Sequence, residues 1–316
     1  MIGKYKAQLA LLLALLASLG VSLCADQIDE YYLDVMLNVG INIILAVSLN
    51  LVNGHTGQFS LGHAGFMAVG AYGAAIVTLE LGASLLPLGA APAFLIALLT
   101  GGVCAAGFGW MVGVPSLRLR GDYLAIVTLG FNEIIRVVLQ NTKSDSIFGG
   151  ALGLKNIPTT TTFFWVFASA AVATYVVTSM VRSTWGRGFL AVRDDEIAAS
   201  AMGVPTVKYK VTAFVTGAFF AGIGGGLYAH LRSTISPEGF NFLKSVDIVV
   251  MVILGGMGST AGVIVAAIAL TVLNEFLRDF EQYRMIVFSL LLILMMILRP
   301  QGLLPVGLFA KKGKSA

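Results

Sequence analysis

The stretch from Val35 to Asn53, VMLNVGINIILAVSLNLVN, contains no charged side chain. A helix of about 20 apolar residues is long enough to cross the roughly 30 Å hydrocarbon core of a bilayer. Similar stretches recur along the 316 residues of the chain, of which 57% are hydrophobic and 11% charged. Soluble globular domains are about 45–50% apolar and about 25% charged. The sequence therefore predicts an all-α polytopic membrane protein.

About ten membrane-spanning helices are expected from the lengths of the apolar runs. If both termini lie inside, most of the 20 basic residues fall on the inner side, as the positive-inside rule requires. The run 245–258 is short, so a re-entrant segment stays open as an alternative. The predicted spans are 7–24, 35–53, 58–80, 91–114, 123–141, 161–181, 210–231, 245–258, 260–277 and 284–299.

The first apolar run follows Lys4 and Lys6, a pattern shared by signal peptides and signal anchors. The run ends without a small-x-small cleavage site, which favours an uncleaved first helix. No composition change marks a domain boundary, so residues 1–316 are expected to form one transmembrane domain. Its long charged inner loop is 182–210, and both termini are expected in the cytoplasm.

The composition argues against a cytosolic enzyme, a disordered tail and a disulfide scaffold. Three histidines without an HExxH or CxxC pattern make a metal site unexpected. The C-terminal Gly313-Lys314-Ser315 imitates the end of a P-loop, but Leu308 stands where that motif needs glycine. We therefore expect no catalytic residues, no ATP site and no cofactor in this chain. Its net charge of +4 is explained by the inner-side bias rather than by nucleic acid.

A glycine-rich polar turn, residues 53–66, joins two of the apolar runs. Polar groups at membrane depth need protein partners or a water-filled path, because lipid offers no hydrogen bonds. Both a translocation path and plain interhelical hydrogen bonding remain open. The candidate path residues in this turn are Asn53, Thr56, Gln58, Ser60 and His63.

A second polar stretch lies on the run 121–136, where Asn132 and Arg136 share a helix face and Glu133 can pair with Arg136. It could line the path or form a structural ion pair. A second glycine-rich break adds Gly255, Gly256 and Ser259 as path candidates. Breaks in corresponding halves of a chain are typical of inverted-repeat transporters, although no residue-level repeat is visible here.

The inner loop contains a predicted short helix outside the bilayer, from Asp194 to Gly203. Acidic residues favour the first turn of a helix, and a glycine followed by proline ends it. Its small apolar face, Ile197 and Ala201, could dock a partner or belong to an ordinary connector.

Five stretches together resemble the permease subunits of bacterial ATP-binding-cassette (ABC) importers for branched-chain amino acids, the LivM-type family. They occur in the order of that family between about residues 48 and 305. They are GQFSLGHAGFMAVGAY, GDYLAIVTLGFNEIIR, RSTWGRGFLAVRDDEIAASAMGV, TISPEGFNFLKSVDIVVMVILGGMGS and ILRPQGLLP. The chain departs from the family at 148–153, where a Thr-Gly-Gly-Pro-like stretch is usual, and at Thr184, which replaces a usual proline.

The resemblance implies about ten helices in the bacterial inner membrane and alternating access driven by ATP and Mg²⁺ on partner subunits. The implied partners are a second homologous permease subunit, two ABC ATPase subunits and a periplasmic solute-binding protein. The resemblance also implies that the short inner helix transmits the motion of the ATPase to this chain. The residues that it assigns to this coupling are Arg193, Asp194, Asp195, Glu196, Ile197, Ala198, Ala199 and Gly203.

Branched-chain amino acids are the solute that the resemblance implies, with urea or short amides as an alternative within related permeases. Two other classes of transporter remain open from the residues alone. One is a stand-alone secondary transporter, with Glu133 or Asp247 coupling protons. The other is a passive channel for small neutral solutes, with the polar turn as its filter.

Overall fold

The computed structural model of the protein describes residues 2–23, 28–85, 89–117, 123–143, 147–278, 286, 289–290, 293–294, 297 and 302–303. These residues form helices and loops, with a single isolated antiparallel bridge between Leu154 and Ile235. The predicted all-α class is therefore confirmed for the part of the chain that is described.

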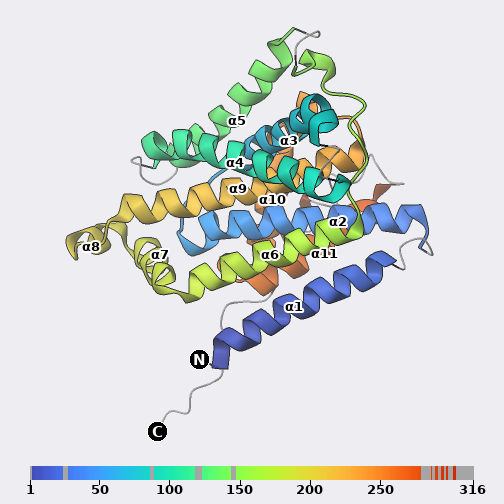
Figure 1. Ribbon diagram of the computed structural model, residues 1–316. Coiled ribbons are helices and arrows are strands. Elements are labelled where there is room, and N and C mark those ends of the chain that lie inside the picture. Colours follow the sequence, from blue (N-terminus) through green and yellow to red (C-terminus); the bar gives the residue numbers. More distant parts are fainter. Residues whose placement is uncertain are drawn as a thin grey trace.

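Figure 1 shows the helices, most of them running side by side in one bundle. Three short turns of other types interrupt them: a π-helix at Leu51–His55 and 3-10 helices at Gly150–Leu152 and Pro237–Phe240. The α-helices are α1 (Ile2–Leu23), α2 (Glu30–Asn50), α3 (His63–Leu85), α4 (Ala90–Ser116), α5 (Tyr123–Asn141), α6 (Phe163–Arg182), α7 (Thr184–Asp194), α8 (Glu196–Ala201), α9 (Thr206–Arg232), α10 (Phe242–Gly255) and α11 (Thr260–Phe276).

Six helical segments among the described residues are long and apolar enough to cross a membrane. They are Glu30–His55, His63–Gly82, Ala90–Ser116, Tyr123–Asn141, Phe163–Arg182 and Thr206–Arg232. Six such segments make the chain a multi-pass membrane protein. The total of ten spans stays a prediction, because α10 and α11 have only 14 and 17 residues and the predicted span 284–299 lies largely outside the described residues.

Two predicted boundaries were wrong. The third span was expected to begin at residue 58, but residues 57–62 are not helical and α3 begins at His63. The helix expected from 194 to 203 is shorter: Asp194 ends α7, and Asp195 is the N-cap of α8, which ends at Ala201. In both places the local hydrogen bonds of polar side chains decide the boundary, and hydropathy does not reveal them.

The core is built around α2, in which every residue from Val39 to Asn50 is buried. A helix that is apolar all round belongs in the interior rather than at the surface of a bundle. Helices α6, α9, α10 and α11 pack around it.

Helices α3, α4 and α9 approach one another closely through small residues. A Cβ atom on Gly70 would lie 2.1 Å from Cα of Gly222, and one on Gly109 would lie 2.6 Å from Cβ of Ala218. Small residues let membrane helices pack backbone to backbone, which compensates for the weak hydrophobic drive between them in lipid. Gly109/Gly113 and Gly222/Gly226 are two such GxxxG pairs, and each of these glycines faces a neighbouring helix.

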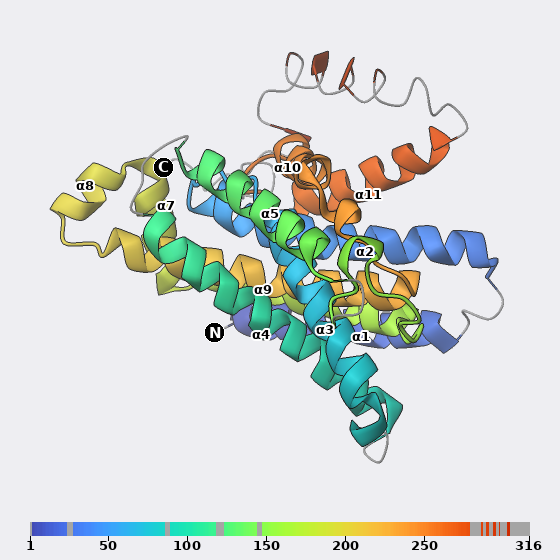
Figure 2. The same ribbon diagram turned by 90° about the horizontal axis from the view of Figure 1, so that it is seen from above.

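The bundle has two distinct ends. Helices α7 and α8 project from one end, at the left of Figures 1 and 2. The start of α2 and the end of α9 lie at the opposite end, at the right of Figure 1. We call these the α8 end and the α2-start end.

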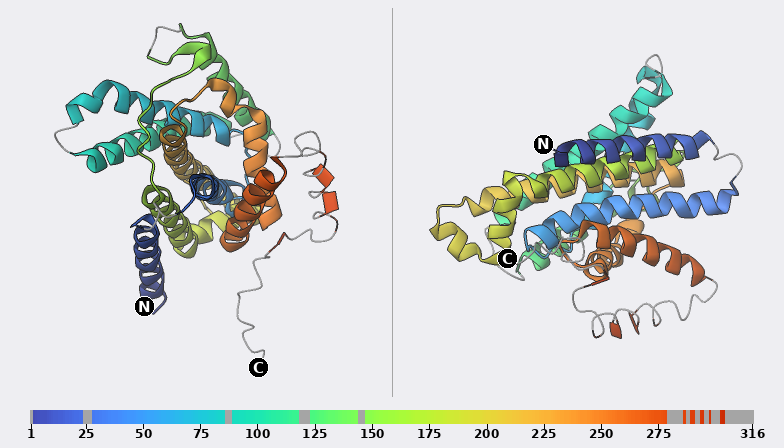
Figure 3. Two further views of the ribbon diagram at one scale, coloured as in Figure 1. Left: turned by 90° about the vertical axis from the view of Figure 1, so that its right-hand side faces the viewer. Right: turned by 90° about the horizontal axis from the view of Figure 1, so that it is seen from below.

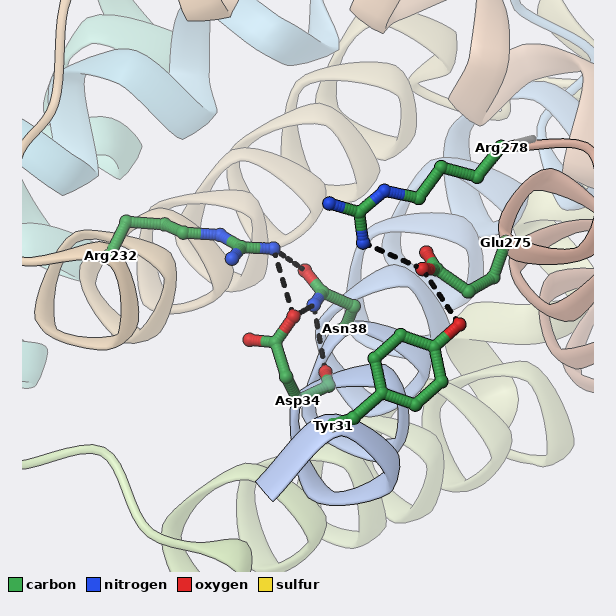
Figure 4. A network of polar contacts seen from close by, with 6 residues as sticks. All are labelled: Tyr31, Asp34, Asn38, Arg232, Glu275 and Arg278. Atoms are coloured by element: carbon green, nitrogen blue, oxygen red, sulfur yellow. Dashed lines mark hydrogen bonds and ion pairs between the residues drawn. The ribbon is translucent and has the colours of Figure 1, made fainter. Parts of the chain in front are cut away.

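A polar network closes the α2-start end (Figure 4). Arg232 at the end of α9 pairs with Asp34 of α2 at 3.3 Å and donates to Asn38 at 3.2 Å. The hydroxyl of Tyr31 donates to Glu275 of α11, which also pairs with Arg278. The ends of α9 and α11 are thereby held beside the start of α2, so both helices run antiparallel to α2.

Candidate functional site

The first glycine-rich break begins where α2 changes into a π-helix at Leu51–His55 and then into the non-helical segment 57–62. A segment inside a membrane bundle must have its backbone groups satisfied by protein. The N–H of Gln58 donates to the carbonyl of Val52 at 3.1 Å, and that of Ser60 donates to Oδ1 of Asn53 at 3.2 Å. Asn53 therefore supports the break directly.

Helix α5 supplies the next partners of this break. The N–H of Leu61 donates to Oγ1 of Thr128 at 3.0 Å. A Cβ atom at Gly62 would lie 2.5 Å from the carbonyl oxygen of Thr128, and one at Gly65 would lie 3.1 Å from Oδ1 of Asn132. The two glycines allow the chain to lie directly on the face of α5 that carries Asn132.

The start of α3 is anchored by two hydroxyl groups. Nε2 of His63 and Oγ of Ser48 are 2.8 Å apart, and the N–H of Ala64 donates to Oγ of Ser245 at 3.0 Å. All of these side chains are buried. His63 thus ties α3 to α2, as a histidine in a packing role does.

The second break, Gly256–Ser259, lies between α10 and α11. Gly256 and Gly258 have φ values of +99° and +86°, which side chains other than glycine rarely adopt. Oγ of Ser259 accepts from the N–H of Gly262 and caps α11. The chain therefore reverses here within four residues.

The two breaks meet each other. Oδ1 of Asn50, at the end of α2, accepts a hydrogen bond of 2.8 Å from the N–H of Gly258, 208 residues away. A Cβ atom on Gly54 would lie 2.3 Å from the nitrogen of Gly258. Residues 302–303 also lie here, because the N–H of Leu303 donates to the carbonyl of Leu254 at 2.9 Å. We call this contact between 50–62 and 254–259 the break junction.

Arg193 of α7 lies over the break junction. A Cβ atom on Gly57, where φ is +68°, would be 2.9 Å from Cγ of Arg193. One on Gly258 would be 3.4 Å from Nη1 of the same arginine. Arg193 also donates to Asp194 at 3.2 Å. One side chain from the inner loop therefore touches both breaks.

Helix α8 follows directly after Arg193 and Asp194. Oδ1 of Asp195 accepts from the N–H groups of Ile197 and Ala198 at 2.8 and 3.0 Å, which is N-cap geometry. Gly203, with φ +82°, follows the last helical turn. The cap is thus one residue later than the predicted start at Asp194, and Gly203 lies just past the helix end, as predicted.

The exposed side of α8 and the residue after it carries large apolar side chains, and an ion pair joins the helix to α9. Ile197 is 66% exposed and Met202 is 84% exposed. Glu196 pairs with the buried Lys210 of α9 at 2.5 Å. Ala199 is buried beneath the helix, whereas Ala198 faces out. The α8 surface is therefore a small apolar patch held rigidly against the long helix α9.

Several buried amides beside the junction have side-chain atoms with no hydrogen-bond partner among the described residues. They are Nδ2 of Asn50 and Asn53, and both polar side-chain atoms of Gln58 and Asn132; Nε2 of His55 is a further such atom. Burying a polar group without a partner costs free energy, so such groups usually meet water or a ligand. This arrangement can offer both donors and acceptors to a polar solute.

Other path candidates have different surroundings. Thr56 donates to the carbonyl of Val52 at 2.6 Å, an ordinary helix-end bond. Glu133 pairs with Arg136 at 2.8 Å, and Arg136 donates to Gln140. These side chains are partly exposed on α5, and no hydrogen bond or ion pair joins them to the break junction within the described residues. The structure thus brings the breaks and Asn132 together and leaves Glu133 and Arg136 apart.

Sequence reasoning missed four residues that build this site: Asn50, Thr128, Lys210 and Ser245. Each is a polar residue in or beside an apolar run, and nothing in its spacing indicates its partner. Lys210, which is 4% exposed, was counted only as an inner-loop charge. A buried lysine almost always has a partner, so its position inside a helix was the available signal.

Comparison with known proteins shows similarity to branched-chain amino acid permeases. The family model described as branched-chain amino acid transport system, permease component, matches residues 31–298. The high-affinity branched-chain amino acid transport system permease protein LivM of Escherichia coli (strain K12) is 40% identical over 299 residues, covering 84% of this chain and 68% of its own length. LivM of Salmonella typhimurium is 38% identical over 306 residues, covering 86% and 69%.

A more distant relative is the high-affinity branched-chain amino acid transport system permease protein BraD of Pseudomonas aeruginosa. It is 26% identical over 284 residues, covering 83% of this chain and 90% of its own length. No solved structure matches this chain.

Proposed function

Because this chain belongs to the branched-chain amino acid permease family, we propose that it is a membrane-spanning permease subunit of an ABC importer for branched-chain amino acids. The observation that carries the proposal is the match of nearly the whole chain, 31–298, together with six long apolar helices. The names of the relatives favour branched-chain amino acids over urea or short amides, and a transport-system component over a stand-alone channel or secondary transporter.

The solute path passes the break junction. Non-helical backbone within a transporter bundle is found where it lines a cavity, and solute sites form at such interruptions. Gln58 and Asn132 supply unpaired amide atoms there, while Asn53 and Ser60 keep the backbone open. Gly255, Gly256 and Ser259 provide the opposite wall. Neutral polar groups suit a site that must bind a solute weakly and then release it.

Coupling to ATP hydrolysis runs through α8 and Arg193. The exposed side chains of Ile197 and Met202 form an apolar contact surface for an ATPase subunit. Asp195 and Gly203 set the two ends of the helix that carries this surface. Movement of α8 reaches α9 through Glu196 and Lys210. It reaches the break junction through Arg193, which contacts both breaks. The same motion thereby acts on the long helix and on the proposed path.

The proposed assembly contains a second homologous permease subunit, two ABC ATPase subunits and a periplasmic solute-binding protein. ATP and Mg²⁺ are used by the ATPase subunits, and this chain contributes no catalytic residue. We place it in the bacterial inner membrane with both termini and α8 on the cytoplasmic side. The α2-start end then faces the periplasm.

The experiment is purification of the tagged full chain from its native membrane in mild detergent, followed by mass spectrometry of the proteins that accompany it. We expect ATPase subunits with P-loops and a second permease chain. Reconstituted in vesicles with the binding protein, this complex should concentrate radiolabelled leucine only when ATP is supplied on the α8 side.

A chain that purifies alone in several detergents and passes leucine without ATP would contradict the proposal. If the intact complex takes up urea or acetamide in preference to leucine, the assignment as a permease subunit still holds. The proposal that the solute is a branched-chain amino acid is then wrong.

A further inference from the structure

Helix α1 lies at the edge of the bundle and packs against α6 (Figures 1 and 3). Its leucines Leu9, Leu12, Leu13 and Leu16 are 58–64% exposed. In a membrane protein, leucines on the outside of a peripheral helix face the acyl chains of lipids. The contact between α1 and α6 is therefore open to the bilayer.

A groove of about 610 Å³ runs between these two helices. Small residues from both sides make room for it: Ala14 and Ala17 on α1, and Ala170 and Ala171 on α6. The remaining walls are mainly apolar and aromatic, including Phe167 and Tyr175.

The shape of this groove suits one extended chain. Its α6 wall runs from Phe163 to Arg182, about 28 Å at 1.5 Å per residue. The groove is therefore long enough for an extended acyl chain to lie along α6.

One end of the groove is basic. Arg182, the last residue of α6, lines it together with the hydroxyl-bearing Thr178 and Ser179. No carboxylate forms an ion pair with Arg182 in the described part of the chain. The beginning of α1, whose sequence includes Lys4 and Lys6, lies at this same α8 end (Figure 3).

The distances match one leaflet of a bilayer. Ala170 is twelve residues before Arg182, about 18 Å along the helix, and half the hydrocarbon thickness is about 15 Å. A headgroup beside Arg182 would therefore place its acyl chain along the alanines. Basic pockets between membrane helices bind anionic headgroups.

We propose that the groove between α1 and α6 is a binding site for one anionic phospholipid of the leaflet at the α8 end. The phosphate accepts hydrogen bonds from Arg182, and one acyl chain fills the space beside Ala14 and Ala171. The bound lipid completes the packing of α1, which has few protein neighbours. This site is separate from the break junction and does not depend on which solute is carried.

The test uses the full chain, purified with whatever subunits accompany it, washed free of loose lipid and titrated with phosphatidylglycerol or phosphatidylcholine. Native mass spectrometry counts the bound lipids. We expect one phosphatidylglycerol to be retained in preference to phosphatidylcholine. Arg182→Gln should weaken phosphatidylglycerol binding about fivefold, the usual contribution of one basic residue near an anionic membrane surface.

Matched variants separate the groove from general effects. Ala14→Phe fills the groove and should abolish retention of the lipid, whereas Leu16→Phe, on the same helix but outside the groove, should not. Arg187→Gln, on α7, is the control for loss of charge. A monodisperse elution profile and unchanged far-UV circular dichroism establish that each variant is folded.

Equal binding of the two lipids, or unchanged phosphatidylglycerol binding in both Arg182→Gln and Ala14→Phe, would overturn the proposal. So would a photo-crosslinking residue at position 17 that captures a polypeptide rather than lipid in the native membrane.

Discussion

At the scale of single residues, the break junction depends on glycines that lie where no side chain fits. Gly54 has the nitrogen of Gly258 and the amide of Asn50 within 2.3 Å of the place that a Cβ atom would occupy. Backbone atoms cannot swing aside as a flexible side chain can, so a methyl group here must separate the two breaks.

We therefore expect Gly54→Ala to reduce ATP-dependent leucine uptake at least tenfold in reconstituted vesicles. Overpacking of this kind costs about 1–3 kcal/mol and shifts backbone. Gly130→Ala is the matched control, because that glycine has nothing within 4 Å of its Cβ position. Its uptake should stay within twofold of the original. Normal uptake by Gly54→Ala would contradict the expectation that transport depends on close contact between the two breaks.

Arg193 is the second decisive residue, because its contacts extend to both breaks. Arg193→Ala removes that link and leaves α8 and its apolar residues in place. We expect ATP hydrolysis by the assembled complex to continue while leucine uptake per ATP falls at least fivefold. Arg187→Ala, an exposed arginine on the same helix, should preserve the ratio. An equal fall in both variants would indicate a general effect of basic residues on α7.

At the scale of secondary-structure elements, α8 is too short to be stable alone, since isolated helices below about 12 residues are marginal. Its six residues are held by the Asp195 cap, worth about 1 kcal/mol, and by the ion pair between Glu196 and Lys210. Lys210 is buried, so loss of its partner leaves an uncompensated charge inside the protein.

Glu196→Lys should therefore leave the chain in the membrane but uncouple ATP hydrolysis from uptake, measured as labelled leucine transported per ATP hydrolysed. The reversed pair, Glu196→Lys with Lys210→Glu, should recover part of the coupling because opposite charges again face each other. Undiminished transport per ATP in the single variant would contradict a role for this pair.

At the scale of the whole molecule, the two ends of the bundle should face opposite sides of the membrane. Met202, beside α8, and Glu238, in the turn after α9, are both exposed. In a background with Cys24 and Cys104 replaced by alanine, Met202→Cys should react with an impermeant maleimide only in inside-out vesicles. Glu238→Cys should react only in intact spheroplasts. Labelling of both cysteines from one side would contradict the alternate crossings.

Much of this architecture could be predicted from the sequence. Hydropathy identified the six long helices because burial of about 20 consecutive apolar residues is a local property. A short helix between Asp194 and Gly203 was recognisable, to within one or two residues at each end, because capping involves residues only two or three positions apart. The two breaks were visible as clusters of glycine.

The meeting of those breaks could not be read in the same way. The bond between Asn50 and Gly258 joins residues 208 positions apart, and Arg193 reaches the junction from a third part of the chain. The start of α3 at His63 rather than at 58 likewise depends on Thr128 and Asn53, which satisfy the intervening backbone.

The sequence by itself determined that this protein is a helical membrane protein, about where its long apolar helices lie and where glycine-rich breaks interrupt them, because hydropathy, length and capping act between neighbouring residues. Its motifs, by their resemblance to a known family, indicated a permease. Only the tertiary structure decided that the two interruptions form one junction under Arg193, that Glu196 pairs with Lys210, and that α1 leaves a groove beside α6. Such contacts depend on how whole helices pack, and packing is set by the combined shape of surfaces that no single stretch contains.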